Sequence, residues 1–283
     1  MKLFVEYRRS ILTALALLTL TTYLYATRPA PLAEAGGNTS ERISTQVFLQ
    51  ILAVENAAIR HLYTSQIVGP GMKQGLKFQE DWKEKTSESG PLPALFLREM
   101  STILQRDASD IGLFLGSDFP IVSANLFKGL QKTEYEKLKS TKQAQYFLDS
   151  GSGRYTAMYA DFASAKACVT CHNEHAKTPK KDWVLNEMMG ATTWSYPRKD
   201  VSVAEVLRYT TALRSAALET YGLYLTKLTT FKTSPVPTVA AQWPKEGMFL
   251  PTIVEMKKAI ETQNNALTMQ TLLDARATQV AKK

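Results

Sequence analysis

Cysteine and histidine are both scarce in this sequence, with two cysteines and three histidines among 283 residues. Both cysteines lie three positions apart in one short segment, so they can serve only a single purpose. So few histidines leave no Ser/His/Asp set to assemble, and the sequence also lacks a glycine-rich phosphate loop and a carboxylate pair spaced for acid–base work. We therefore expect a protein that is not an enzyme.

Long apolar runs are also scarce, and Ile11 to Ala26 is the single long uncharged run in the sequence. This run is long for the core of a signal peptide and slightly short for a spanning helix, which needs about 20 residues. We expect residues 1–27 to be an uncleaved N-terminal membrane anchor, with a cleaved signal segment as the alternative. The flanking positive charges stay in the cytoplasm, and the rest of the chain is exported. These charges come from Lys2, Arg8 and Arg9.

The sequence Cys168-Val169-Thr170-Cys171-His172 has the C-x-x-C-H spacing at which c-type haem is attached. Each thiol adds to one vinyl group of the porphyrin, and the following histidine becomes an axial ligand of the iron. The motif predicts one covalently attached haem c, held by Cys168 and Cys171, with His172 on the metal. Covalent haem is attached outside the cytoplasm, which agrees with an exported chain on the periplasmic side of the inner membrane.

Two cysteines at this spacing have three other common uses. A zinc site is the strongest of them, because His175 would complete a set of four ligands, but Cys171 and His172 are adjacent and would be cramped on one tetrahedral ion. A thioredoxin-like redox pair requires a strand before the motif and a helix directly after it. A structural disulfide across two residues would be strained and would close a negligible loop.

Acidic residues are fewer than basic ones, so that the formal net charge is +8. In an exported protein this charge is better matched to an acidic redox or signalling partner, or to anionic lipid headgroups, than to nucleic acid. Three lysines close to the motif are candidates for attracting such a partner, and generic surface charge is the alternative interpretation. They are Lys177, Lys180 and Lys181.

The order of predicted elements indicates an α+β fold, with a small antiparallel sheet flanked by helices. After a linker at 28–39, a long N-terminal helix ends at Gly69-Pro70-Gly71. A polar helix at 72–86 and a second helix from Pro93 follow. Beyond these we expect a strand at 110–117, a charged helix at 133–148, a strand at 154–162, the motif in a loop, and a strand at 191–196.

Residues 199–283 are expected to form a helical C-terminal extension. Ser202 and Glu205 are spaced as a capping box at the start of its first helix. A proline-containing connection leads to a last helix that starts near Pro251. The two helices form a hairpin, which packs on the body of the protein or on another subunit.

Several segments resemble the family of periplasmic PAS-like domains that carry one c-type haem. The resemblance covers roughly residues 40–198 and is most specific from Cys168 to Trp183. It implies a PAS-like fold for this domain, covalent haem on the two cysteines, His172 as an iron ligand, and a role in redox or gas sensing. The other matching segments are Arg60 to Thr64, Leu92 to Phe96, Gly190, and the Ser-Tyr-Pro sequence at 195–197.

The second axial ligand is left open by the motif. His61 lies on the apolar stripe of the long helix and is our first candidate, and the alternatives are His175, a methionine, or an open site. Arg60 is a candidate to pair with a haem propionate, although a surface ion pair is its default interpretation. Tyr155, Met158 and Tyr159 precede the motif and are expected to line the haem pocket, unless they only pack the sheet. The methionines considered as ligands are Met72, Met100, Met158, Met188 and Met189.

Two functions are consistent with this pattern. The protein is either a membrane-tethered mono-haem cytochrome that transfers electrons, or a haem-based redox or gas sensor that signals through a partner protein. A carrier keeps two stable axial ligands, whereas a sensor is five-coordinate or loses its distal ligand on reduction.

Overall fold

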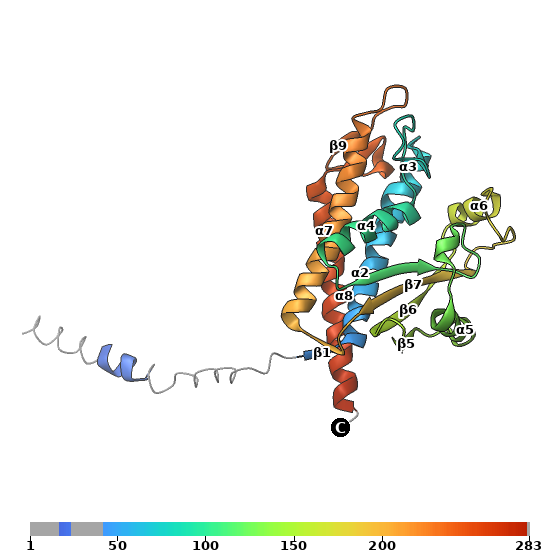
Figure 1. The fold of residues 1–283 in the computed structure, drawn as a ribbon. Coiled ribbons are helices and arrows are strands. Elements are labelled where there is room, and N and C mark those ends of the chain that lie inside the picture. The colour runs from blue at the N-terminus through green and yellow to red at the C-terminus, as the bar shows by residue number, and fades with distance from the viewer. Residues whose placement is uncertain (1–16, 24–41, 282–283) are drawn as a thin grey trace, which may run out of the picture. The chain divides into compact units, whose positions relative to one another are not determined.

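The computed structural model describes residues 17–23 and 42–281. The predicted anchor and linker therefore lie almost entirely outside the described residues. Within the described ranges, no helix is both long enough and apolar enough to cross a bilayer. Residues 42–281 belong to one compact unit, in which long helices stand beside a small sheet (Figure 1). The α+β class predicted from the order of elements is confirmed.

The long N-terminal helix is longer than predicted. Helix α2 spans Thr45–Leu62 and is capped by Ser44, whose hydroxyl accepts a hydrogen bond from the Val47 amide. The helical path then widens into the π-helical turn η1, Tyr63–Val68, and continues as α3, Gly69–Lys73. The prediction that Gly69-Pro70-Gly71 ends the helix is wrong, because Pro70 lies in the first turn of α3, where its missing N–H is tolerated.

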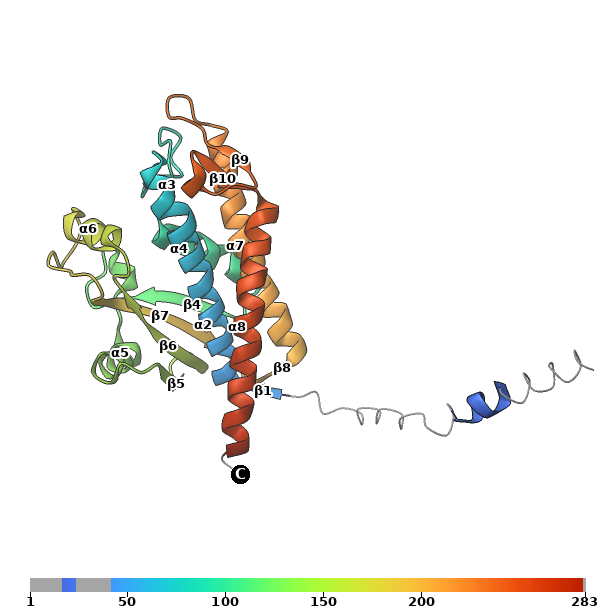
Figure 2. The same cartoon turned by 180° about the vertical axis from the view of Figure 1, so that it is seen from behind.

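Three further long helices pack with α2 around one hydrophobic core (Figure 2). They are α4, Pro93–Asp107, α7, Val203–Leu228, and α8, Ile253–Ala281. The capping box at the start of α7 is confirmed, because the side chains of Ser202 and Glu205 each bond the other's backbone amide. The predicted C-terminal hairpin is thus formed by α7 and α8, and both helices pack directly on α2.

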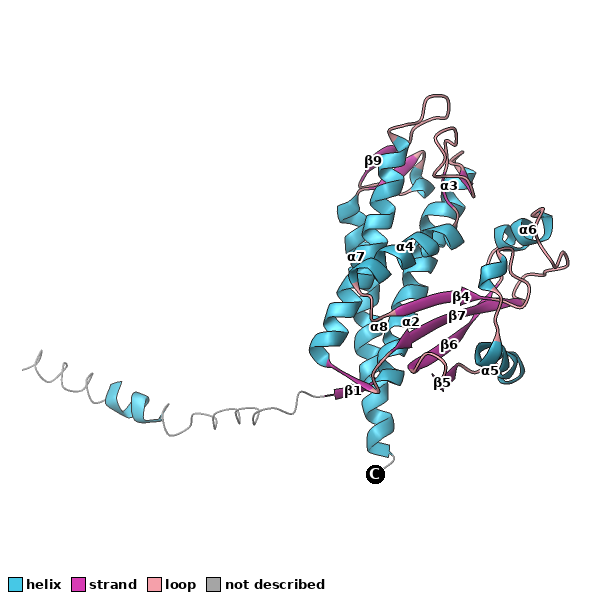
Figure 3. Ribbon diagram, in the orientation of Figure 1, coloured by secondary structure: helices cyan, strands magenta, loops and turns pink. Residues whose placement is uncertain are grey.

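The main sheet has four antiparallel strands in the order β4-β7-β6-β5 (Figure 3). Its strands are β4, Gly112–Gly116, β5, Gln145–Asp149, β6, Arg154–Phe162, and β7, Met188–Tyr196. The predicted helix at 133–148 is wrong in part. Helix α5, Gly129–Thr141, ends at Lys142 in a left-handed conformation with φ of 59°, and the following residues pair with β6 as an edge strand.

Short strand pairs join distant segments. Strand β1, Arg42–Ser44, pairs with β8, Asp200–Ser202, and thereby brings the starts of α2 and α7 together. Strand β2, Phe78–Gln79, pairs with β3, Gly90–Pro91, in the region where a polar helix was predicted at 72–86, so that prediction is wrong. The α7–α8 connection contains two short strands, β9, Thr238–Ala240, and β10, Phe249–Pro251, with the 3-10 turn η3, Pro244–Glu246, between them. The 3-10 turn η2, Ser123–Asn125, precedes α5.

The two faces of the sheet bury different sets of side chains, because successive residues of a strand point in opposite directions. One face joins the helical core through residues such as Ala157 and Trp194. The other face packs against α5 through a small cluster that contains Met158 and Ala191. A side chain's place in β6 or β7 therefore decides which of the two environments it meets.

The contact between β4 and β7 requires glycine at position 190. A β-carbon there would lie 2.3 Å from the Gly116 carbonyl oxygen, which is backbone and cannot rotate away. We expect Gly190→Ala to lower the free energy of unfolding by about 1–3 kcal/mol. The matched control is Gly222→Ala in α7, where the new methyl group has 3.7 Å to Ile253 and the helix gains stability. Urea unfolding measures both, and an equal effect of the two variants would contradict the prediction.

Candidate functional site

The C-x-x-C-H sequence lies on a helix and not in a loop as predicted. Helix α6, Lys166–Glu174, is inserted between β6 and β7 and lies at the far end of the sheet (Figure 1). Cys168, Cys171 and His172 occupy positions i, i+3 and i+4 of α6, which places the three side chains on one face of the helix. The site thus presents two sulfurs and one imidazole in the same direction.

Both thiols of the motif are free and partly buried. Burial raises the pKa of the Cys171 thiol, and the nearby Glu80 carboxylate raises this pKa further. Thiols of dithiol–disulfide redox enzymes have lowered pKa values, because the thiolate is their nucleophile. The site therefore keeps Cys171 as a neutral thiol, which argues against the thioredoxin-like interpretation.

His172 is held as a neutral imidazole. Burial lowers the pKa of His172, and the neighbouring His175 lowers this pKa as well. Its Nδ1 atom is buried and has no hydrogen-bond partner in the part of the chain that the structure describes. A neutral imidazole is the form that binds a metal ion. The ring is thus prepared as a ligand but receives no orienting hydrogen bond from the described residues.

His175 is occupied by contacts within the protein. Its Nδ1 accepts a hydrogen bond from the Lys177 amide at 3.1 Å, so that the proton of the neutral ring lies on Nε2. Nε2 faces the Glu80 carboxylate at 3.0 Å. Since both nitrogens are engaged, His175 orders the end of α6 and is not free to bind an iron atom in this conformation.

The segment after α6 folds back on the helix and is anchored by Asn173. The Asn173 amide donates to the Trp183 carbonyl at 3.0 Å and accepts from the Trp183 amide at 2.9 Å. The Trp183 ring is buried, packs edge-on against Phe119, and carries the Lys180 ammonium over its face at 4.3 Å. Lys180 also pairs with Asp182 and Glu187. Of the three lysines expected to attract a partner, Lys180 therefore already has its charge compensated by two carboxylates of the same chain.

Apolar side chains close to α6 in the chain are exposed to solvent. Phe162, at the end of β6, is 48% exposed, and Val184 and Leu185, in the returning segment, are 61% and 54% exposed. Large exposed apolar side chains that gather in one region mark surfaces that bind another molecule. The surroundings of the motif are thus suited to an apolar group such as a porphyrin ring.

Two of the other predicted site residues lie in α2, opposite the end of β6 that leads to α6. Arg60 pairs with Asp161 of β6 at 2.6 Å and also contacts the Thr192 hydroxyl at 3.3 Å. The predicted Arg60 therefore has a carboxylate partner of its own. His61 is exposed, and within residues 42–281 its ring takes part in no hydrogen bond or ion pair.

The residues of β6 that were predicted to line the pocket separate into different environments. Tyr155 lies seven positions before Phe162, which corresponds to about 23 Å of extended strand, so it is at the end of β6 away from α6. Met158 is fully buried in the cluster beneath α5, with Phe127 and Tyr135. Met158 is core packing, and the position of Tyr155 does not support a pocket role.

Asp161 and Glu80 are contact residues that the sequence reasoning missed. Asp161 lies in a strand that was predicted from its alternating residues. Its charge, on the face of the strand that is directed at α2, could have indicated an ion pair with that helix. Glu80 meets His175 only because the segment between α3 and α4 passes beside α6. The contact between Glu80 and His175 cannot be predicted from a local sequence pattern, because the two residues are far apart in the chain.

The described residues contain no cluster of side chains that would bind a zinc ion. Across residues 17–23 and 42–281, no three histidine, cysteine, aspartate or glutamate side chains gather in a way that would hold a metal ion. A c-type haem needs two free thiols and one neutral imidazole, and Cys168, Cys171 and His172 meet these requirements. The residues present therefore fit a covalent haem better than a zinc ion.

Fold and site together define an α+β domain with a cysteine–cysteine–histidine helix inserted between the last two strands of its four-stranded sheet. The sequence model of the Tll0287-like family matches residues 39–197, just over half of the chain. The protein belongs to the Tll0287-like family. No curated protein and no solved structure matched the sequence.

Proposed function

We propose that the protein is a mono-haem c-type cytochrome that acts in electron transfer and catalyses no reaction of its own. The observation that carries this proposal is the common face of α6, on which two free thiols and a neutral imidazole point in one direction. Cys168 and Cys171 would hold the haem, and His172 would bind its iron. The bound haem supplies one-electron redox chemistry, whose potential the protein sets through ligation and burial.

The surroundings of α6 support the same proposal. Phe162, Val184 and Leu185 offer apolar surface for a porphyrin ring, and removing this surface from water stabilises the bound state. The hydrogen bonds between Asn173 and Trp183 keep the returning segment close to the helix. A porphyrin ring bound here would therefore lie against apolar side chains on one side.

The location and partner follow from the chemistry of the site. Covalent haem attachment implies export, so we propose that residues 1–27 hold the protein on the periplasmic side of the inner membrane, with a soluble periplasmic protein after signal cleavage as the alternative. Lys177 and Lys181 are exposed beside the site and carry no ion pair within the described chain. They would attract an acidic redox partner and increase its rate of association.

His61 is proposed as the second axial ligand. It lies next to Arg60, whose pairing with Asp161 brings this turn of α2 to the end of β6 that leads into α6. We expect His61→Ala to change the ferric and ferrous spectra of the haem-loaded protein, because a different sixth ligand changes the ligand field. His175→Ala is the control, since both ring nitrogens of His175 are engaged elsewhere. An unaltered Soret band in His61→Ala would eliminate this ligand.

A second candidate function, haem-based redox or gas sensing, is favoured by the construction of α2. The helix is followed by the π-helical turn η1, which begins two residues after His61, and such turns are frequent at functional sites. A change of ligand at this position would act on the helix that carries the core contacts to α7 and α8. In this case the signal would pass to a partner protein.

Carbon monoxide distinguishes the two functions. We expect the ferrous spectrum of the wild-type protein to be unchanged by added CO, because an electron carrier keeps both axial ligands. The matched variant is His61→Ala, whose opened site should bind CO and shift its Soret band. A wild-type protein that binds CO as readily as this variant would favour the sensor and reject the carrier.

A further inference from the structure

The main sheet has two edge strands, and the described chain covers only one of them. Strands β4 and β5 are the outer strands in the order β4-β7-β6-β5 (Figure 3). An edge strand presents unpaired backbone N–H and C=O groups, which can pair with a strand of another chain, and natural proteins cover or charge such edges. The treatment of each edge therefore indicates where another chain can add.

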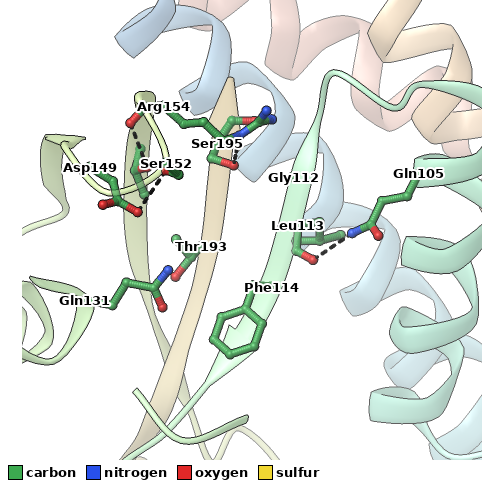
Figure 4. Close-up of a pocket in the computed structure, with 11 residues that line it drawn as sticks. Gln105, Gly112, Leu113, Phe114, Gln131, Asp149, Ser152, Arg154, Thr193 and Ser195 are labelled. Atoms are coloured by element: carbon green, nitrogen blue, oxygen red, sulfur yellow. Dashed lines mark hydrogen bonds between the residues drawn. The ribbon is translucent and has the colours of Figure 1, made fainter. Parts of the chain in front are cut away.

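The edge of β4 is covered by neighbouring segments. The Leu113 carbonyl accepts hydrogen bonds from the Gln105 amide at 3.1 Å and from the Ser101 hydroxyl at 3.3 Å, both in α4. Figure 4 shows Gln105 reaching this carbonyl. Directly after β4, the Ser117 amide donates to the Asn125 carbonyl at 3.0 Å. Strand β4 is thus closed to a further strand.

The edge of β5 is open in the part of the chain that the structure describes. Among the described residues, no hydrogen bond from outside the β5–β6 hairpin reaches the backbone of Gln145–Asp149. The strand contains no proline, no lysine and no bulge, which are the common protections against strand addition. The backbone groups that point away from β6 are therefore available to another strand.

Apolar side chains flank this open edge. Tyr146 and Leu148 lie opposite Ala157 and Tyr155 of β6, so they are on the sheet face that is directed at the helical core. Ala157 is fully buried, whereas Tyr146 is 37% and Leu148 is 52% exposed, because the helices do not extend over β5. Phe147 points to the other face and packs under α5. The edge thus combines free backbone groups with an exposed apolar surface.

The sequence of β5 is complementary to itself in an antiparallel pair. A two-fold axis at Phe147 places Tyr146 opposite Leu148 of a second copy, and Gln145 opposite Asp149 of that copy. Aromatic and aliphatic side chains stabilise cross-strand pairs, and an amide can donate to a carboxylate. An in-register parallel pair would instead place two Asp149 carboxylates side by side. The strand therefore favours a second copy in the antiparallel direction.

Charges at the two ends of β5 favour the same direction. Lys142, which ends α5, is exposed and precedes β5 by three residues. Asp149 lies at the other end of the strand, where its carboxylate bonds the Gly151 amide and the Ser152 hydroxyl. Antiparallel pairing brings Lys142 of each copy to the same end of the joined strands as Asp149 of the other copy. Opposite charges then meet at both ends of the interface.

We propose that two copies of the protein join through β5, with the strands paired antiparallel about an axis at Phe147. The two four-stranded sheets then continue into each other, and the interface is the same surface on both copies. Two joined five-residue strands form a small interface, so the dimer is of the weak, reversible class, with a dissociation constant on the order of micromolar. No residue of α6 takes part, so the dimer forms with or without haem.

Light scattering of the purified full chain, in a mild detergent and after size-exclusion chromatography, tests this interface. The protein mass should rise from one chain towards two as the concentration increases. Leu148→Lys should weaken association by about tenfold or more, because it removes an apolar contact and adds a cation to each half of the interface. Tyr146→Glu should weaken it by a similar factor, because a carboxylate then lies opposite Leu148.

The double variant Leu148→Lys with Tyr146→Glu tests the register itself. Pairing about Phe147 places each new lysine opposite a new glutamate of the second copy. Association should therefore recover by about threefold or more relative to either single variant. A different register, or a different surface, would give no such recovery.

The matched control is Val236→Lys, which adds the same charge at a site with 53% exposure. Val236 belongs to the segment between α7 and β9, and β9 lies at the far end of the helices from β5 (Figures 1 and 2). Its association should equal that of the wild-type protein, and thermal melts show that each variant is folded. The proposal is overturned if the full chain stays monomeric, if Leu148→Lys and Val236→Lys weaken association equally, or if the double variant does not recover.

Discussion

Replacing Cys168 and Cys171 together by serine is expected to abolish covalent haem attachment completely. The wild-type protein, made with the c-type maturation machinery, should have the mass of the chain plus one haem after denaturation. The double variant should have the mass of the chain alone, because a serine hydroxyl does not add to the vinyl groups. Each single variant should keep at most one thioether bond. Mass spectrometry of the denatured protein and in-gel haem staining measure this directly.

His172→Ala is the control that separates attachment from ligation. It leaves both thiols of α6 in place, so we expect the haem to remain covalently bound while the spectrum of the iron changes. If the wild-type protein instead has an unmodified mass and two alkylatable thiols, the proposed function is wrong.

Removing the cation from the interface between α2, α7 and α8 should cause the largest loss of stability. Glu55 in α2 is fully buried and is bonded by Arg214 of α7 at 2.8 Å and 2.5 Å. Asn264 of α8 also donates to the Glu55 carboxylate at 3.2 Å, and Thr268 donates to it as well. Arg214→Met would leave this carboxylate buried without its cation. We expect a loss of about 3–5 kcal/mol in the free energy of unfolding.

The double variant Glu55→Leu with Arg214→Met tests the cause of this loss. It removes the carboxylate together with the cation, so that no charge is left uncompensated, and we expect it to recover a large part of the lost stability. Urea unfolding of the wild-type protein and of both variants gives the comparison. A loss below about 1 kcal/mol in Arg214→Met would mean that the buried pair is not a main contact between the three helices.

The elements with strong local signals were predicted well from the sequence. The capping box at Ser202 placed the start of α7, Pro93 placed the start of α4, and the alternation after Gly153 placed β6. The errors occurred where a local signal competed with tertiary contacts. Residues 145–148 were predicted as the end of a charged helix, but pairing with β6 makes residues 145–149 a strand.

The candidate site shows the same division. The spacing of the two cysteines and His172 was sufficient to identify the motif. The roles of the surrounding residues were not predictable, because each depends on a partner far away in the chain. Arg60 is paired with Asp161, His175 with Glu80, and Met158 is buried under α5.

By itself, the sequence determined the cysteine–cysteine–histidine motif of α6, the α+β class and the start of the capped helix α7, because these depend on neighbouring residues and their spacing. The tertiary structure alone decided that the motif is helical and that Glu55 is buried against α7 and α8. These features depend on which faces of strands and helices meet, and that is settled by packing between segments distant in the chain.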